Sequence, residues 1–357
     1  MAGSAYVHIP FCDNICFYCD FCRVISKEKE KWLETIKKEI QEKKMGRLRT
    51  LYFGGGTPSS LEEDHFKELS SLFSFQEEYE WTVECNPDSL TESKIQLYSR
   101  LGVNRISLGV QTFKEDLLTS IGRKHTNKQV FDRIQQLKEN KISNISIDLI
   151  YALPNQSMED LKKDLDTFLT LNLPHLSIYS LQIEENSIFG KRGLEPVDED
   201  LEADMYEYIC ERLKKAGYEH YEISSFCKPD KYSRHNLIYW SDEDFYGLGM
   251  GASGKENNVR YDNTRSLKMY LDQGASPVYI ETTLEEKAYE AIMMGLRSTL
   301  GFDIRKWENR YKKSFKESYK DVLEKYVPEY LVLEKNTCKP TQKGMEMLNS
   351  ILVDFLE

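Results

Sequence analysis

Three cysteines near the start of the chain have the type and spacing needed to hold a metal cluster. The segment AYVHIPFCDNICFYCDFCRV places Cys12, Cys16 and Cys19 in a CxxxCxxC pattern, with Cys22 three residues further on. Thiolate sulfur is a soft ligand that selects iron–sulfur clusters or zinc over hard cations. Structural zinc commonly uses two cysteine pairs, and this triplet has no matching pair downstream. The spacing therefore favours an iron–sulfur cube with three protein ligands and one open iron.

Alternative uses of the same cysteines remain open at this point. Cys22 could complete a four-ligand site, either for zinc or for a ferredoxin-like cluster. A disulfide framework is not expected, because no signal peptide precedes the cysteines and a chain of 357 residues can bury a core without cross-links. We therefore expect a cytoplasmic protein whose eight cysteines stay reduced.

Charge and hydropathy argue against two classes of partner. The formal net charge is -11, whereas binding to nucleic acid needs concentrated positive charge. The locally basic stretch RKWENRYKKSFKESYK lies in a segment that is nearly neutral, and we interpret it as a solvated helix face. No apolar run approaches the roughly 18 to 20 residues that span a bilayer. We expect neither a nucleic-acid partner nor a membrane span.

Repeated strand and helix patterns must position the cysteines. An expected strand over residues 5–9 leads into the cysteine loop, and residues 27–44 have the periodicity of an amphipathic helix. Short strands then alternate with helical patterns, in the order TLYF, WTVEC, RISLGVQ, ISIDLIY and LSIYS. Six such units within about 190 residues are too few to close an eight-stranded barrel. The predicted fold class is α/β, a partial, open (βα)6 barrel.

Polar residues and glycines stand at the carboxyl ends of these strands, where the working groups of parallel α/β folds gather. GGGTP follows the second strand, and glycine there lets the backbone approach a ligand closely. Arg123 follows Gln111 by twelve residues and has the planar shape that clamps a carboxylate. Asp148 is a carboxylate inside a buried strand, which is costly unless it has a partner. Glu84 lies in an apolar strand and should face the barrel interior.

HIPFC, the cysteine triplet and Tyr18 together resemble the start of radical S-adenosylmethionine proteins. The resemblance is to the oxygen-independent coproporphyrinogen III oxidase family and its HemW-type heme-chaperone branch, and it covers essentially the whole chain. It implies that the triplet holds a 4Fe-4S cluster whose fourth iron chelates S-adenosylmethionine. The oxidases carry a further cysteine two positions after the third ligand, but here Asp20 and Phe21 precede Cys22, which we expect to lie outside the ligand set.

The resemblance also implies which residues contact S-adenosylmethionine. Tyr6 stands where a tyrosine precedes the HIP segment, and Gln182 replaces a small residue of the oxidases. The implied S-adenosylmethionine-binding residues are Tyr6, Tyr18, Gly55, Gly56, Thr57, Glu84, Gln111, Arg123, Asp148 and Gln182.

The segment HNLIYW matches the HNxxYW signature of the heme-chaperone branch, where it is associated with heme binding. Imidazole is a common heme ligand, and flat aromatic side chains suit a porphyrin face. The resemblance therefore implies a heme site that includes His235, Tyr239 and Trp240. The alternative is that these side chains only pack the segment onto the barrel.

These observations predict three regions and one leading function. We expect the partial barrel over residues 1–225, an irregular aromatic layer over 226–280, and a small helical, winged-helix-like domain over 281–357. The predicted function is that of a heme chaperone that binds a 4Fe-4S cluster, S-adenosylmethionine and heme and delivers heme to an acceptor protein. The alternative is an oxygen-independent coproporphyrinogen III oxidase, which uses the deoxyadenosyl radical on propionate side chains. HNLIYW and the short stretch before the HIP segment favour the chaperone.

Overall fold

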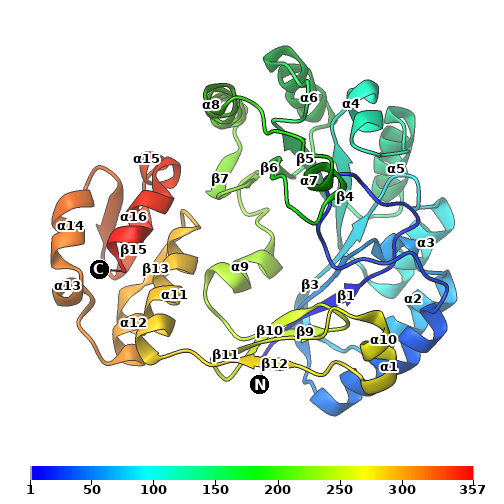
Figure 1. The fold of residues 1–357 in the computed structure, drawn as a ribbon, viewed down its shortest axis with the longest axis horizontal. Helices are drawn as coiled ribbons and strands as arrows, with labels where there is room; N and C mark the ends of the chain where they lie inside the picture. The colour runs from blue at the N-terminus through cyan, green and yellow to red at the C-terminus, as the bar shows by residue number, and fades with distance from the viewer. Residues whose placement is uncertain (1, 357) are drawn as a thin grey trace.

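Six strands alternate with helices in the first half of the structure, a computed structural model that describes residues 2–356 (Figure 1). The strands are β1 (Ser4–Ile9), β2 (Leu48–Gly55), β3 (Phe75–Cys85), β4 (Arg105–Gln111), β5 (Asn144–Tyr151) and β6 (His175–Ser180). The helices are α1 (Lys29–Lys43), the 3-10 turn η1 (Pro58–Ser60), α2 (Glu63–Ser70), α3 (Glu92–Leu101), α4 (Glu115–Ser120), α5 (Asn127–Glu139), α6 (Met158–Leu171), α7 (Ile188–Lys191) and α8 (Glu199–Lys215). The predicted alternation of strands and helices is confirmed.

All six strands belong to one nine-stranded sheet in the order β7-β8-β6-β5-β4-β3-β2-β1-β9. Strands β1 to β6 run parallel to their neighbours. Strands β7 (Glu219–Glu222) and β8 (Ser225–Cys227) extend the sheet beyond β6 in antiparallel orientation, and β9 (Tyr246–Leu248) pairs in parallel with β1. Within residues 2–356, β7 and β9 do not pair with each other, so the barrel stays open as predicted.

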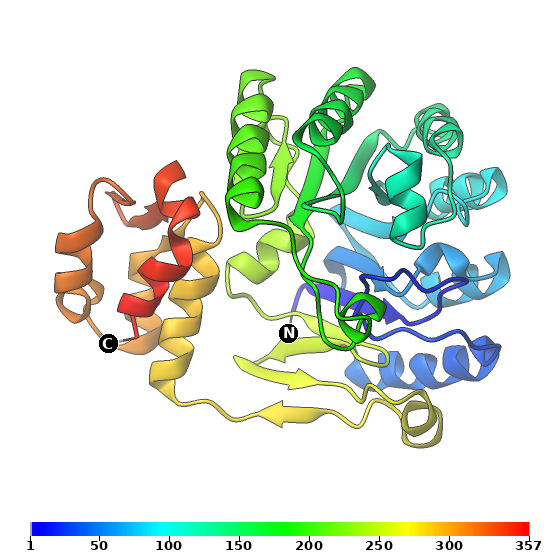
Figure 2. The same cartoon turned by 45° about the horizontal axis from the view of Figure 1, so that its top comes forward.

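The two faces of the parallel strands carry different chemistry. In β4, Ile106 and Leu108 pack in the main apolar core, whereas Arg105 and Ser107 line a cavity inside the barrel. The same alternation turns Asp148 of β5 toward that cavity. Successive side chains of a strand point to opposite faces, and the helices that alternate with the strands cover the outer one (Figure 2). The barrel interior is therefore free to be polar.

Residues 226–280 contain more regular structure than we predicted. They form α9 (Arg234–Trp240), β9, a separate antiparallel sheet of β10 (Ser253–Glu256), β11 (Val259–Asp262) and β12 (Val278–Ile280), and the helix α10 (Leu267–Gln273). Because β9 joins the main sheet beside β1, this segment completes one edge of the barrel. The prediction of an irregular layer was wrong, because these strands are only three or four residues long and periodicity cannot reveal them.

The C-terminal region forms a second body beside the barrel (Figures 1 and 2). It contains α11 (Leu284–Leu296), β13 (Phe302–Asp303), α12 (Ile304–Tyr311), α13 (Phe315–Ser318), α14 (Lys320–Tyr326), β14 (Leu331–Glu334), β15 (Thr337–Pro340), α15 (Gln342–Glu346) and α16 (Leu348–Asp354). Its own core is centred on Trp307 and Phe315. Strands β14 and β15 form an antiparallel hairpin, so helices plus a hairpin agree with the winged-helix-like fold expected here.

An ion network built on the buried Asp242 joins this body to the barrel. The Asp242 carboxylate accepts hydrogen bonds from Lys255, and from Arg310 of α12 at 3.0 Å.

Among the described helices, none combines the length and the apolar character required to cross a bilayer.

Candidate functional site

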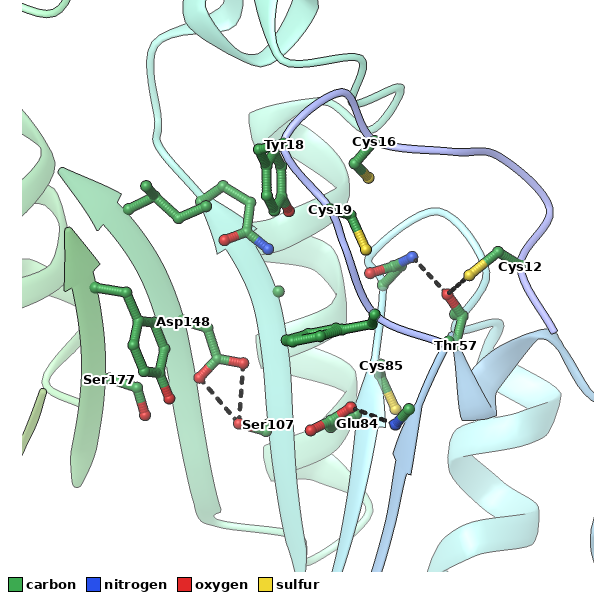
Figure 3. Close-up of a pocket in the computed structure, with 18 of the residues that line it drawn as sticks. Cys12, Cys16, Tyr18, Cys19, Thr57, Glu84, Cys85, Ser107, Asp148 and Ser177 are labelled. Atoms are coloured by element: carbon green, nitrogen blue, oxygen red, sulfur yellow. Dashed lines mark hydrogen bonds between the residues drawn. The ribbon is translucent and has the colours of Figure 1, made fainter. Parts of the chain in front are cut away.

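The carboxyl ends of the parallel strands surround a cavity of about 370 Å³ that the cysteine loop borders (Figure 3). Strands β2 to β6 and helix α9 contribute side chains to its wall. The sequence-predicted residues that line it are Cys12, Cys16, Tyr18, Cys19, Gly55, Gly56, Thr57, Glu84, Gln111, Arg123, Asp148 and Gln182. Tyr6, His235, Tyr239 and Trp240 are not among the lining residues.

The cysteine loop is fastened to the barrel at several points. Its ends meet where Val24 N–H donates to the Pro10 carbonyl at 2.8 Å. The Asn14 side chain donates to the Gly122 carbonyl at 2.7 Å. A Cβ atom at Gly56 would lie 2.7 Å from the Pro10 backbone, so only glycine lets GGGTP approach the loop this closely. The loop is therefore held over the cavity before any ligand binds.

A polar network connects two of the cysteines through the strand ends. Cys12 Sγ lies 3.4 Å from Thr57 Oγ1, and the Asn86 amide donates to Thr57 Oγ1 at 3.2 Å (Figure 3). Arg123 donates to Asn86 Oδ1 at 2.9 Å and to Cys16 Sγ at 3.6 Å. Asn86 was not among the predicted site residues, although it follows β3 by one position. Its role is to hold Thr57 and Arg123 in place.

The thiols suit a cluster better than a single ion. Cys12, Cys16 and Cys19 are free and partly buried along one loop. Among residues 2–356, no three His, Cys, Asp or Glu side chains converge on one ion position. A cube presents its irons at separate corners, so its ligands need not converge. Burial raises the pKa of the Cys12 thiol to about 11, so a metal that binds there must displace a proton.

A cradle beside the cysteines is shaped by Gly109 and Gln111. Gln111 adopts a positive φ of 69° where β4 bulges against β5. A Cβ atom at Gly109 would lie 3.0 Å from Gln111 Nε2, 3.3 Å from Asn86 Oδ1 and 3.4 Å from an Arg123 nitrogen. The Arg123 Nε atom is buried without a hydrogen-bond partner among the described residues. Gly109, Gln111 and Arg123 all line the cavity, and a guanidinium in a cavity wall suits a bound carboxylate such as that of S-adenosylmethionine.

Two carboxyl groups line the same cavity. Glu84 accepts hydrogen bonds from the Tyr52 hydroxyl at 2.8 Å and the Gly55 N–H at 3.1 Å. Asp148 accepts from the Ser107 hydroxyl at 3.0 Å through both oxygens. Burial raises the pKa of Glu84 to about 7 and that of Asp148 to about 6. Both groups therefore offer ligands a polar wall whose charge changes near neutral pH.

Glu84 should make stability depend on pH. Its folded pKa of about 7 lies above the ordinary value of 4.5, so the folded state holds this proton more tightly than the unfolded state. The free energy of unfolding should therefore fall as pH rises from about 4.5 to 7. Glu84→Gln removes this contribution, and we expect the variant to gain about 2 to 3 kcal/mol relative to wild type between pH 5 and pH 8.

Thermal unfolding of the wild type and of Glu84→Gln at both pH values measures this effect. Glu77→Gln, an exposed acid on the same strand, is the matched control and should show no such gain. Parallel pH profiles for wild type and Glu84→Gln would mean that Glu84 keeps its ordinary pKa.

Tyr6, a predicted S-adenosylmethionine residue, borders a neighbouring cavity of about 590 Å³ instead. Tyr6 lines this second cavity, and its hydroxyl lies 3.1 Å from His8 Nδ1. Cys22 lines it too, with its thiol donating to the Arg265 carbonyl at 3.6 Å. The two cavities share Gly55, Glu84 and Phe21 as lining residues. Tyr6 as placed is therefore adjacent to the predicted S-adenosylmethionine cavity and not in its wall.

Both ring nitrogens of His235 are engaged in hydrogen bonds within the fold. Its ring is fully buried, with Nδ1 2.8 Å from Thr50 Oγ1 and Nε2 2.8 Å from the Tyr239 hydroxyl. Ligation would break one of these bonds and move the ring out of the core. Tyr239 borders the second cavity, whereas Trp240 lines neither. His235 packs α9 against β2 in this structure, and its ligation of heme iron stays a prediction.

Several lining residues escaped the prediction from sequence. They are Asn14, Phe21, Arg23, Tyr52, Cys85, Asn86, Arg105, Ser107, Gly109, Ile150, Ser177, Tyr179, Ser180, Leu181 and Asn236. A signal for several of them was present, because Arg105, Ser107, Gly109 and Gln111 stand at alternate positions of one strand. Asn236 stands in the HNxxYW signature, but the sequence does not show that its helix reaches this cavity, because that depends on tertiary packing.

Two family models match this chain, the Radical SAM superfamily over residues 6–168 and the HemN C-terminal domain over residues 282–346. A relative named Heme chaperone HemW from Lactococcus lactis is 41% identical over 368 residues, covering 99% of this chain and 97% of its own length. Another of that name, from Bacillus subtilis, is 35% identical over 376 residues and covers 99% of both chains.

A solved structure of coproporphyrinogen III oxidase (HemN) from Escherichia coli, described as a radical SAM enzyme, matches with a TM-score of 0.86. The match covers 99% of this chain and 90% of that one at 21% identity, so it supports the fold alone. The open barrel, the cysteine triplet at its strand ends and the small C-terminal domain define a protein of the radical S-adenosylmethionine type. Within that class, the chain belongs to the HemW family.

Proposed function

We propose that this protein is a heme chaperone that carries a 4Fe-4S cluster, binds S-adenosylmethionine and delivers heme to an acceptor protein. The observation that carries the proposal is the convergence of the cysteine triplet and the predicted S-adenosylmethionine residues on one cavity, in a chain similar over 99% of its length to relatives named heme chaperones. A cytoplasmic location remains part of the proposal.

The residues present suit the two cofactors. Cys12, Cys16 and Cys19 would hold the cluster, leaving one iron for S-adenosylmethionine. Arg123 would bind the methionine carboxylate, and Gln111 would border it across the Gly109 cradle. When bound, the cluster and S-adenosylmethionine together supply one-electron chemistry.

The acidic residues Glu84 and Asp148 would bind the hydroxyl and amine groups of S-adenosylmethionine. Glu84 and Asp148 each have hydrogen-bonded oxygens that face the cavity, and both accept further bonds from a ligand's hydroxyl or amine groups. Thr57 and Asn86 hold the cysteine loop and Arg123 in position. Thr57 contacts Cys12, and Asn86 bonds to both Thr57 and Arg123.

One sample tests both candidate functions. The protein is reconstituted anaerobically with iron and sulfide, titrated with heme, and assayed for decarboxylation of coproporphyrinogen III. We expect saturable heme binding, transfer of heme to an apo heme protein, and no decarboxylation. Decarboxylation without heme binding would establish the oxidase alternative. A preparation that takes up zinc in place of an iron–sulfur cluster, and binds no S-adenosylmethionine, would overturn both.

A further inference from the structure

Arg105, the first residue of β4, is a buried cation without a dedicated partner. Only 1% of its surface is exposed, and it lines the first cavity. Its Nε atom is buried without an acceptor, and within residues 2–356 its guanidinium forms neither a hydrogen bond nor an ion pair. A buried charge is costly unless it is paired, so such an arginine is unusual in a folded protein.

The nearest carboxylates are already engaged with other groups. Glu80 and Asp148 are close enough to stabilise the charge of Arg105 electrostatically. Glu80 accepts hydrogen bonds from the backbone N–H groups of Arg234 and His235 at the start of α9, at 3.1 and 2.9 Å. Asp148 accepts from Ser107. The guanidinium of Arg105 therefore keeps its donors for a group that enters the cavity.

Arg105 lies at the end of the cavity farthest from the cysteine loop, because it precedes Ser107 and Gly109 along β4. We call this end the floor. Ser107 and Ser177 lie on that side of the view in Figure 3. Asn236 of α9 also lines the cavity, and its side-chain amide makes no hydrogen bond to the described residues. A guanidinium and a free amide together provide the planar donors that suit a carboxylate.

Helix α9 also connects the floor to the second cavity. Asn236 and Tyr239 are three residues apart, and side chains at this spacing lie about 5 to 6 Å apart on one helix face. Tyr239 borders the second cavity together with Phe21 and Phe245. If a flat ligand lay against these aromatic side chains, an acidic substituent at its edge could reach the floor.

We propose that Arg105 and Asn236 form a carboxylate-binding subsite on the floor, which takes a propionate arm of heme whose ring lies against Tyr239 in the second cavity. The identity of the acid rests on the proposed function, whereas the subsite itself rests on the unpaired donors. A free small carboxylic acid has the same binding chemistry and is the other source that the experiment must distinguish.

The test compares heme with its dimethyl ester, which lacks both carboxylates, on the reconstituted full-length protein. Losing a charged hydrogen-bond pair weakens binding by roughly ten- to hundred-fold. We expect wild type to bind heme tighter than the ester by this factor. Arg105→Gln should bind both ligands equally, at the wild-type affinity for the ester. Arg100→Gln, an exposed arginine on α3, is the matched control and should keep the full preference.

The remaining outcomes separate the two sources and the two proposals. Equal binding of heme and its ester by wild type overturns the assignment of the acid to heme. If the subsite instead takes a free acid, sodium propionate should raise the melting temperature of wild type but not that of Arg105→Gln. Equal binding without that propionate effect overturns the subsite. Absence of all heme binding defeats the proposed function, and the propionate measurement still decides the subsite. If Arg105→Gln fails to fold, Asn236→Ala carries the same comparison, because it removes the other donor of the subsite.

Discussion

Replacing Cys16 with serine should reduce the iron and sulfide content of the reconstituted protein to near zero. Cys16 is one of three thiols on a single loop, and Arg123 already donates a hydrogen bond to its sulfur. A serine oxygen is a hard ligand that does not replace thiolate on iron. Metal and acid-labile sulfide analysis, with the visible absorption of the cluster, measures the loss. Cys12→Ser and Cys19→Ser should give the same result.

Cys22→Ser is the matched control for this experiment. Cys22 lies on the same loop but lines the second cavity, where its thiol packs against Gly251 and donates to the Arg265 carbonyl. We expect its cluster content to equal that of wild type. An intact cluster in Cys16→Ser would refute the three-cysteine site, and a lost cluster in Cys22→Ser would identify a fourth ligand.

Arg123→Ala should weaken binding of S-adenosylmethionine by roughly ten- to hundred-fold, the effect of removing a charged hydrogen bond to a carboxylate. Arg123 borders the Gly109 cradle and has an unsatisfied Nε atom there. Calorimetry on the reconstituted protein gives the affinity. Arg100→Ala removes an exposed arginine of α3 and should leave the affinity unchanged.

Arg123 has a second possible role, support of the cysteine loop, which the experiment must distinguish from ligand binding. The side chain also bonds to Asn86 and Cys16, so its loss could loosen the cysteine loop. Cluster content measured on the same variant resolves this, because a ligand-binding role predicts full iron with weak S-adenosylmethionine binding. Wild-type affinity with full iron would show that Arg123 only positions the loop. Gln111→Ala should weaken binding less, since it removes an uncharged donor.

The buried polar residues of the barrel fall into two groups with different consequences for mutation. His175 bonds to Ser146 and Tyr221, each at 2.8 Å, and is fully satisfied inside the core. His235 is satisfied in the same way. Arg105 and Arg123 instead have buried atoms without partners and border a cavity. Satisfied groups support the fold, whereas residues with unsatisfied atoms in a cavity wall are the better candidates for ligand binding.

The sequence alone determined the fold class, the position of the cysteine loop and part of the cavity wall. Strand and helix periods are local properties, and parallel strands place their carboxyl ends on one edge of the sheet, so residues at the ends of β2 to β5 had to meet. Cysteine spacing is likewise local, because three thiols within eight residues can reach one cluster without help from distant segments.

Only the tertiary structure decided which polar side chains are satisfied and which face the cavity. His235 and Asn236 are adjacent in HNLIYW, and the sequence singles out the histidine for its chemistry. In the folded chain the histidine turns into the core toward Thr50, while the asparagine turns to the cavity. The direction of each side chain depends on how α9 packs against β2 and β3, strands more than 150 positions earlier in the chain, and no local pattern encodes that contact.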